Sequence, residues 1–265
     1  MKLIKAFIIL TALLAFAGST YSQTDTNSTK TKKKTSSTKK VYKSYKGCKQ
    51  SSGECTYFQL TYKLLRSGRI NNIINNAVKD SLLSAANIFE DMKAANFKDA
   101  ASNFIAEYDS SLKVQTNGAS WYAEINGKPD FNGKNVVSYA ISQSMYTGGA
   151  HPNSYLAYYN YDKKTGNAIT LATLFGTGWE TALNKVIDAD FRKMKGLSAT
   201  DNLQDKAYLF ENKITYTNNF ALEKKGIRFY YNSYDIAPYS TGPTDLFIPW
   251  VNLKGIISDP SYYTK

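Results

Sequence analysis

The sequence of 265 residues contains a single histidine, His151, and only two cysteines, Cys48 and Cys55. A zinc site usually takes three or four His, Cys or carboxylate ligands, so few ligand sets are possible. A Ser-His-Asp triad could use His151 only if its partners converged from distant segments. After residue 17, no apolar run approaches the roughly 20 residues of a transmembrane helix. The shortage of His and Cys residues therefore predicts no metal and no cofactor, and the lack of a long apolar run predicts no later membrane span. The same shortage favours a protein that is not an enzyme, and no catalytic residue is assigned.

Residues 1–22 have the composition of an export signal peptide. Two lysines precede a stretch at residues 6–17 that is apolar except for one threonine, and small residues follow at Gly18 and Ser19. The stretch is shorter than a transmembrane helix, which favours a cleaved signal, and an uncleaved tether is the alternative. We therefore expect a periplasmic or extracellular protein.

Residues 23–46 are mostly Ser, Thr, Asn and Lys, which predicts a disordered linker because such a segment buries little apolar surface. Ten of the 33 basic residues, but one of the 21 acidic residues, lie within residues 1–46. The remainder therefore carries a charge of only about +3, and no nucleic-acid partner is expected because binding needs a basic face on the fold. The lysines either form a solubilising spacer or attract anionic groups of an envelope surface.

The two cysteines agree with export. Only six residues separate Cys48 from Cys55, and Ser52-Gly53 between them can form a turn. In an oxidising compartment this pair predicts a disulfide that closes a short loop. A redox-active or metal-binding pair would be closer in sequence or would have further ligands.

Hydrophobic periodicity predicts an upstream unit at residues 48–120. Apolar and polar residues alternate at 56–64, as in a half-buried strand, and helical spacing follows at 70–89 and 97–112.

Strand patterns dominate the expected downstream unit at residues 121–258. Strands are expected at 121–125, 136–146 and 155–161, and turn signals occur at Asn126-Gly127, Asn132-Gly133 and Gly148-Gly149. This order predicts an antiparallel meander.

A third helix is expected after the meander. Thr177 and Glu180 have the spacing of a capping box, and Gly196 follows as a stop signal. Extended patterns return at 219–223, 226–231 and 244–248, and a helix-like stretch at 249–257 closes the chain. The sequence therefore predicts an α+β fold of two consecutive subdomains, with antiparallel sheets and helices packed on one side.

Four short motifs occur in order in the downstream half. They are Tyr-Thr-Gly-Gly-Ala-His-Pro-Asn at 146–153, a second motif within 160–175, a third within 229–242 and Ile-Pro at 248–249. This series resembles the domain of unknown function shared by RsiV-type anti-sigma factors and PdaC-type proteins. The upstream unit is similar to the PdaC-type domain that usually precedes it.

The resemblance implies a module on the outer side of a membrane. In RsiV-type proteins the module is a receptor that binds lysozyme, and in PdaC-type proteins it accompanies a separate polysaccharide deacetylase domain. We expect neither the sigma-binding segment of the first nor the catalytic domain of the second here. The expected partners are lysozyme or another extracellular protein, or peptidoglycan or another envelope glycan.

The loop at 147–153 has two interpretations. Gly148 and Gly149 permit positive φ angles, Pro152 fixes the exit, and His151 can bond to loop backbone, which is a structural role. The alternative is contact with a ligand. The candidate ligand-binding residues are Tyr146, Gly148, Gly149, His151, Asn153, Tyr234, Asp235 and Tyr239.

Tyrosine is abundant, with 21 residues in the chain. Strand alternation places Tyr155 and Tyr159 on one face of their strand and Tyr158 on the other. Most tyrosines are expected in the core, and the remainder could form a surface that stacks on sugars or anchors a protein partner.

Carboxylate pairs leave glycoside chemistry open. Two catalytic acids must lie roughly 5–10 Å apart, and the sequence does not show which carboxylates are separated by that distance. The available pairs are Glu124 with Asp130, Asp188 with Asp190, and Asp235 with Asp245, and the sequence favours none of them. The favoured hypothesis is an envelope binding module for a lysozyme-like protein or a cell-wall glycan. The alternatives are a deacetylase-like hydrolase of envelope polysaccharide and a purely structural role.

Overall fold

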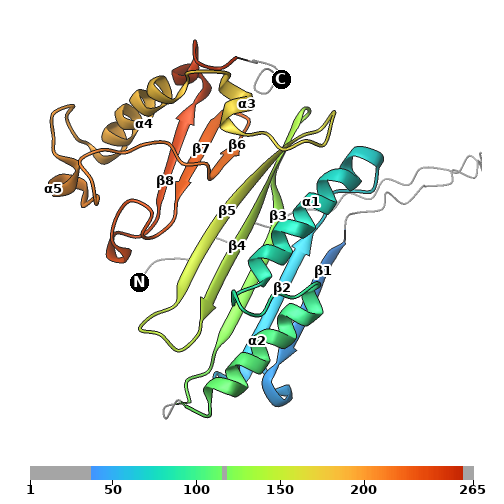
Figure 1. Cartoon of the computed structure of the whole chain (residues 1–265). Helices are drawn as coiled ribbons and strands as arrows, with labels where there is room; N and C mark the ends of the chain where they lie inside the picture. The colour runs from blue at the N-terminus through green and yellow to red at the C-terminus, as the bar shows by residue number, and fades with distance from the viewer. Residues whose placement is uncertain (1–36, 115–117, 259–265) are drawn as a thin grey trace, which may run out of the picture. The chain divides into compact units, whose positions relative to one another are not determined.

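The expected α+β class is confirmed. The computed structural model describes residues 37–114 and 118–258, and all of them belong to one unit of the chain. It contains two sheets, of five and three strands, together with helices (Figure 1). The expected signal peptide and the linker up to residue 36 lie outside the described residues. In the ranges that are described, no helix is long and apolar enough to cross a membrane.

The larger sheet has the strand order β1-β2-β3-β4-β5. Its strands are β1 (Thr38–Ser44), β2 (Tyr57–Lys63), β3 (Tyr122–Asn132), β4 (Val136–Tyr146) and β5 (Asn153–Asp162). Three neighbouring pairs are antiparallel as expected, but β2 and β3 are parallel. Parallel neighbours need a long crossover connection, and the two helices between β2 and β3 provide it.

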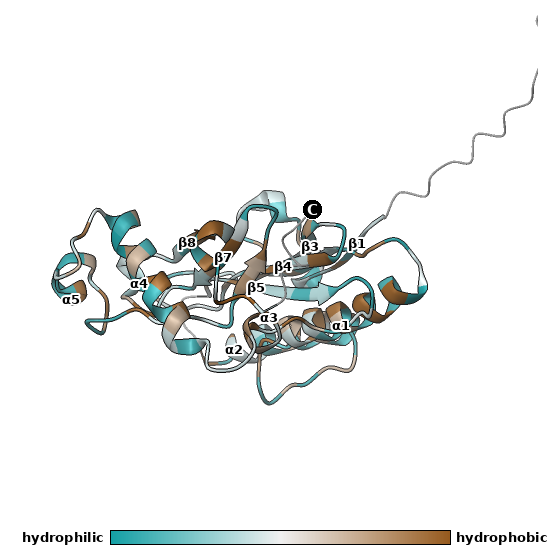
Figure 2. Cartoon of the chain, turned by 90° about the horizontal axis from the view of Figure 1, so that it is seen from above, coloured by the Kyte–Doolittle hydropathy of each residue, from teal (hydrophilic) through white to brown (hydrophobic). Residues whose placement is uncertain are grey.

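Helices α1 (Arg69–Ala86) and α2 (Phe97–Ser111) form this crossover, close to the positions that periodicity predicts. They lie on the same side of the larger sheet (Figure 2). Asn96 caps α2, because its side chain accepts hydrogen bonds from the backbone N–H groups of Lys98 and Asp99, both at 3.0 Å. Phe58 on β2 and Phe104 on α2 are buried in the shared core.

The prediction of a linker through residue 46 is wrong from Thr38 onward, because β1 is an ordered edge strand. It pairs with β2 along its whole length, from Thr38 opposite Lys63 to Ser44 opposite Tyr57. Most of its side chains are exposed. The strand therefore gains order from backbone pairing rather than from apolar burial, and its lysines protect the open edge from further pairing.

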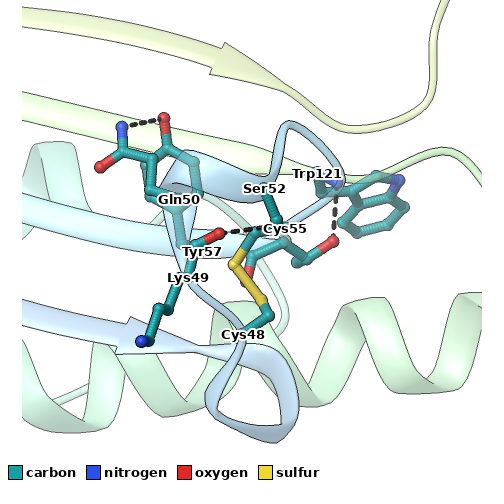
Figure 3. The surroundings of a disulfide bond; sticks show 8 residues. Cys48, Lys49, Gln50, Ser52, Cys55, Tyr57 and Trp121 are labelled. Atoms are coloured by element: carbon teal, nitrogen blue, oxygen red, sulfur yellow. Dashed lines mark hydrogen bonds between the residues drawn. A yellow bond between two sulfur atoms is a disulfide. The ribbon is translucent and has the colours of Figure 1, made fainter.

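The expected disulfide between Cys48 and Cys55 is confirmed. The two Cα atoms lie 5.5 Å apart, and the loop that they close contains a short 3-10 helix at Gln50–Ser52 (Figure 3). Gly53 has a φ of 75°, in the left-handed region that favours glycine.

The predicted turn at Asn126-Gly127 is wrong, because both residues lie inside β3. A Cβ on Gly127 would be only 2.7 Å from Cδ2 of Leu82 on α1 and 2.9 Å from the hydroxyl of Tyr139. The glycine is needed for a close approach of sheet and helix, not for a turn. The other two turn signals of this region do separate β3 from β4 and β4 from β5.

The smaller sheet has the order β6-β7-β8 and its own hydrophobic core. Its strands are β6 (Phe220–Leu222), β7 (Gly226–Tyr231) and β8 (Thr244–Pro249). Helices α3 (Leu171–Phe175), α4 (Glu180–Lys195) and α5 (Leu203–Ala207) precede it. The helix-like end of the chain is the 3-10 helix η4 (Trp250–Leu253).

The capping box predicted for α4 is wrong. Trp179 is the N-cap, with no side-chain hydrogen bond to the helix, although Gly196 ends the helix in the left-handed conformation as predicted. A capping box does occur on α3, where Thr170 and Thr173 bond each other's backbone N–H groups. Gly176 and Gly178, both with positive φ, separate the two helices, so Thr177 is in a turn.

Buried side chains of the larger sheet hold the outer edge of β6. The Ser138 hydroxyl donates to Leu222 O at 2.7 Å and accepts from Leu222 N at 3.0 Å. The Asn160 amide donates to Phe220 O at 2.7 Å, and its oxygen accepts from Leu222 N at 2.9 Å. The two side chains replace a neighbouring strand, because they satisfy backbone groups that a further ladder would bond.

The two sheets are thus linked, while the division into units at residues 120 and 121 stays a prediction. One hydrophobic cluster contains β2, β3, α1 and α2, and the other contains the smaller sheet with α3 and α4. The parallel pair β2 and β3 joins residues from both sides of the expected boundary in one sheet.

Candidate functional site

The loop between β4 and β5 carries the only histidine. Gly148 has a φ of 86°, which favours glycine, whereas a Cβ on Gly149 would meet nothing within 4 Å. Nδ1 of His151 lies 3.0 Å from the carbonyl oxygen of Pro152. The glycine therefore shapes a loop that presents the imidazole beside Pro152.

A second loop, at residues 232–239, is closed by its own polar groups. The backbone N–H of Asn232 donates to Oδ2 of Asp235 at 2.7 Å, and the Asp235 N–H donates to Asn232 O at 3.1 Å. Tyr234 has a φ of 73°, which is uncommon for a residue with a side chain. The Asp235 carboxylate thus holds a strained turn that projects Tyr234 outward, where 55% of it is exposed.

The two loops meet through aromatic rings. The rings of His151 and Tyr239 stack with centroids 3.9 Å apart at an angle of 22°, and the centroid of Tyr234 lies 5.7 Å from that of Tyr239. The Tyr239 hydroxyl also donates to Pro152 O at 3.0 Å. We call His151, Tyr234 and Tyr239 the aromatic cluster. It joins segments more than 80 residues apart in the sequence, and all three rings remain partly accessible.

A polar cavity of about 590 Å³ adjoins the 232–239 loop. Asp235 and Ile236 line one part of it, and the others are lined by tyrosines of β5, by Tyr231 and by residues 215–219. Burial raises the pKa of Tyr155, and the nearby Asp235 carboxylate adds to this rise. The phenol of Tyr155 therefore stays neutral at physiological pH and can donate a hydrogen bond inside the cavity.

Asparagine side chains fix the position of both the cavity and the cluster. The Asn232 amide accepts from Leu156 N at 2.7 Å and donates to Leu156 O at 3.2 Å. The Asn219 amide accepts from Tyr158 N at 2.9 Å and donates to Leu156 O at 2.7 Å. These bonds anchor the 232–239 loop to β5. Sequence reasoning did not single out these asparagines as anchors, since in a sequence they look like ordinary turn residues.

The expected site residues are only partly brought together. His151, Tyr234 and Tyr239 converge, and Asp235 lies in the same loop and lines the adjoining cavity. Tyr146 instead belongs to a row of tyrosines on the larger sheet, with its centroid 6.5 Å from that of Tyr122. Gly148 and Gly149 contribute backbone only, and Asn153 begins β5 opposite Met145.

The carboxylates considered for catalysis are mostly engaged elsewhere. Asp188 pairs with Arg192 at 2.7 Å, and Asp245 pairs with Arg228 at 2.5 Å. Glu124 accepts a hydrogen bond from the Tyr57 hydroxyl at 2.8 Å. Within residues 37–114 and 118–258, no group of three or more His, Cys, Asp or Glu side chains could hold a metal ion.

Two family models match the chain. The model described as "Deacetylase PdaC" matches residues 16–154, and "Protein of unknown function (DUF3298)" matches residues 172–251. No curated protein matches it.

Two crystal structures share the fold. One is a DUF3298 family member from Bacteroides fragilis NCTC 9343, with 23% identity, a TM-score of 0.68, and coverage of 84% of this chain and 93% of that one. The other is a DUF3298 family protein from Pseudomonas aeruginosa PAO1, with 20% identity, a TM-score of 0.66, and coverage of 87% and 98%. Because the PdaC match spans more than half of the residues, the chain belongs to the PdaC family, and a DUF3298 region follows.

Proposed function

We propose that this chain is a binding module of the cell envelope that recognises a lysozyme-like protein through the aromatic cluster. The family and the disulfide are compatible with an exported, envelope-associated protein. The resemblance to RsiV-type receptors suggests lysozyme as the partner to test first. The hydrolase alternative has no residue assigned to it.

The observation that carries the proposal is the accessible stack of His151, Tyr239 and Tyr234. Large aromatic side chains that are already ordered bury much area on binding at little entropic cost, and such residues dominate protein interfaces. One further exposed ring lies nearby, since Phe210 is 50% exposed and its N–H donates to Ile236 O at 2.9 Å. A protein partner would cover this aromatic surface and seal the adjoining cavity.

Binding to purified lysozyme, measured by calorimetric titration, tests the proposal. We expect saturable binding that Tyr234→Ala weakens at least about 10-fold, as for an interface residue worth more than 1 kcal/mol. Tyr42→Ala is the matched control, since Tyr42 is 40% exposed but lies on β1.

His151→Ala separates the two interpretations of the loop. Loss of binding with an unchanged Tm supports ligand contact, and a lowered Tm with intact binding supports a structural role. If wild-type protein binds soluble peptidoglycan fragments instead of lysozyme, and Tyr234→Ala abolishes that binding, the ligand is a glycan. Absence of lysozyme binding would refute recognition of a lysozyme-like protein, and absence of binding to either ligand would refute the aromatic cluster as a recognition surface.

A further inference from the structure

A row of four tyrosines crosses the face of the larger sheet that α1 and α2 leave uncovered. Tyr42, Tyr57, Tyr122 and Tyr146 come from β1, β2, β3 and β4 in spatial order. Successive ring centroids are 6.0, 6.1 and 6.5 Å apart. Strand alternation turns Tyr57 away from its buried neighbour Phe58, so this row faces away from the helices.

A groove of about 280 Å³ lies beside the tyrosine row. Polar residues of β3, β4 and β5 line the sheet side of the groove: Glu124, Asn126, Ser142, Ser144 and Ser154. Glu124 and Ser144 are paired across β3 and β4, and each lies two residues along its strand from a tyrosine of the row, Tyr122 or Tyr146. Tyr230, Ser233 and Pro243 form the opposite side. The groove therefore combines hydroxyl, amide and carboxylate groups with aromatic rings.

Most of these polar groups are free to bind a ligand. Within the described part of the chain, the side chains of Asn126, Ser142, Ser144, Ser154 and Ser233 have no hydrogen-bond partner. Oε1 of Glu124 accepts from the Tyr57 hydroxyl at 2.8 Å and from Nε2 of Gln50 at 3.1 Å. Oε2 of Glu124 has no partner among the described residues, so it can accept a further hydrogen bond.

The disulfide loop fixes the position of this carboxylate. Gln50 lies within the loop that Cys48 and Cys55 close, and its amide also donates to the Tyr57 hydroxyl at 2.8 Å (Figure 3). Burial, followed by the hydrogen bond that the Tyr57 hydroxyl donates to Glu124, raises the pKa of Tyr57 to about 12. The phenol thus stays protonated and keeps donating to Glu124, which leaves the groove ordered before a ligand arrives.

We infer that this groove and the tyrosine row form a binding site for a neutral oligosaccharide. Sugar hydroxyls both donate and accept, which matches unpaired serine, asparagine and carboxylate groups, and the apolar faces of sugar rings suit tyrosine. The Glu124 carboxylate opposes an anionic ligand such as a nucleic acid. The groove borders the 232–239 loop at Ser233, and Tyr155 lines both the groove and the 590 Å³ cavity, but no ring of the aromatic cluster lines the groove. The groove takes a different ligand, so the inference goes beyond the proposed protein recognition.

Calorimetric titration with two neutral probes, the β-1,4-linked tetramers of N-acetylglucosamine and of glucose, tests this inference. We expect saturable binding of at least one tetramer and a Kd at least 10-fold higher for Glu124→Ala and for Tyr122→Ala. Glu107→Ala, on α2 and therefore on the opposite side of the sheet, is the control for loss of a carboxylate. Thermal unfolding of each variant verifies that it is folded. If Glu124→Ala or Tyr122→Ala does not fold, Asn126→Ala is used in its place, because the Asn126 side chain is exposed.

Two results would overturn the inference. One is the absence of saturable binding to both tetramers. The other is binding that Tyr234→Ala abolishes and Glu124→Ala leaves intact, which would place the sugar at the aromatic cluster. Lysozyme binding is measured separately and depends on Tyr234, so failure of this inference and failure of the proposed function are distinguishable.

Discussion

Ser138→Ala tests the way in which the two sheets are joined. The side chain is fully buried, and its hydroxyl donates to Leu222 O at 2.7 Å, accepts from Leu222 N at 3.0 Å and lies 2.6 Å from Oδ1 of Asn160. Alanine keeps the backbone of β4 and removes only this hydroxyl. The change therefore isolates the contribution of the hydrogen bonds that hold the edge of β6.

The expected loss of stability depends on which buried polar groups keep a hydrogen-bond partner in the variant. Leu222 N still bonds Asn160, but Leu222 O loses the hydroxyl, and a buried polar group left unpaired costs about 1–3 kcal/mol. The hydroxyl has one proton, so its contacts with Leu222 O and with Oδ1 of Asn160 are alternatives and are counted once. We predict that the free energy of unfolding falls by about 1–3 kcal/mol, which lowers Tm by roughly 2–12 °C for a domain of this size.

Urea denaturation followed by circular dichroism measures this change. Ser142→Ala is the matched control, because Ser142 lies on the same face of β4, is half-buried and has no hydrogen-bond partner among the described residues. The control should change stability by less than about 0.5 kcal/mol. If Ser138→Ala had an effect as small as that of the control, the hydroxyl would not hold β6 and the reasoning would be refuted.

Three further predictions concern other parts of the fold. Replacing both Cys48 and Cys55 by serine should lower the free energy of unfolding in urea by about 2 kcal/mol, since the short loop is no longer closed in the unfolded chain; equal stability would contradict this. Gly127→Ala should cost about 1–3 kcal/mol in thermal unfolding, because the new Cβ would lie 2.7 Å from a methyl group of α1, and an unchanged Tm would argue against that close approach. Glu124→Gln should lower the pKa of Tyr57 from about 12 in an ultraviolet titration, and an unaltered titration would exclude their interaction. Because that pKa is raised on folding, the associated stability is complete below about pH 10 and is lost as the pH rises through about 12.

Hydrophobic periodicity predicted the elements that depend on burial. Helices α1 and α2 and strand β2 have clear apolar spacing and were placed correctly within a few residues. Strand β1 was missed because its order comes from pairing with β2, and its exposed, lysine-rich sequence resembles a linker. Gly127 was misread because a glycine needed for close packing has the same local signal as a glycine in a turn.

The candidate site was predictable only in part. The motif around His151 and the motif around Tyr234 were singled out, but their convergence depends on long-range contacts such as the Asn232 bonds to Leu156. Tyr146 was grouped with them by sequence proximity, although strand alternation places it on the uncovered face of the sheet. Which face a strand residue occupies becomes clear only when its register is known.

Titration of wild-type protein and Tyr234→Ala with lysozyme tests the central claim most directly. We predict saturable binding for the wild type and a Kd at least about 10-fold higher for Tyr234→Ala, with the Tm of the variant unchanged. Wild-type protein that does not bind lysozyme, or Tyr234→Ala protein that binds it equally well, would contradict the assignment of the aromatic cluster as its recognition surface.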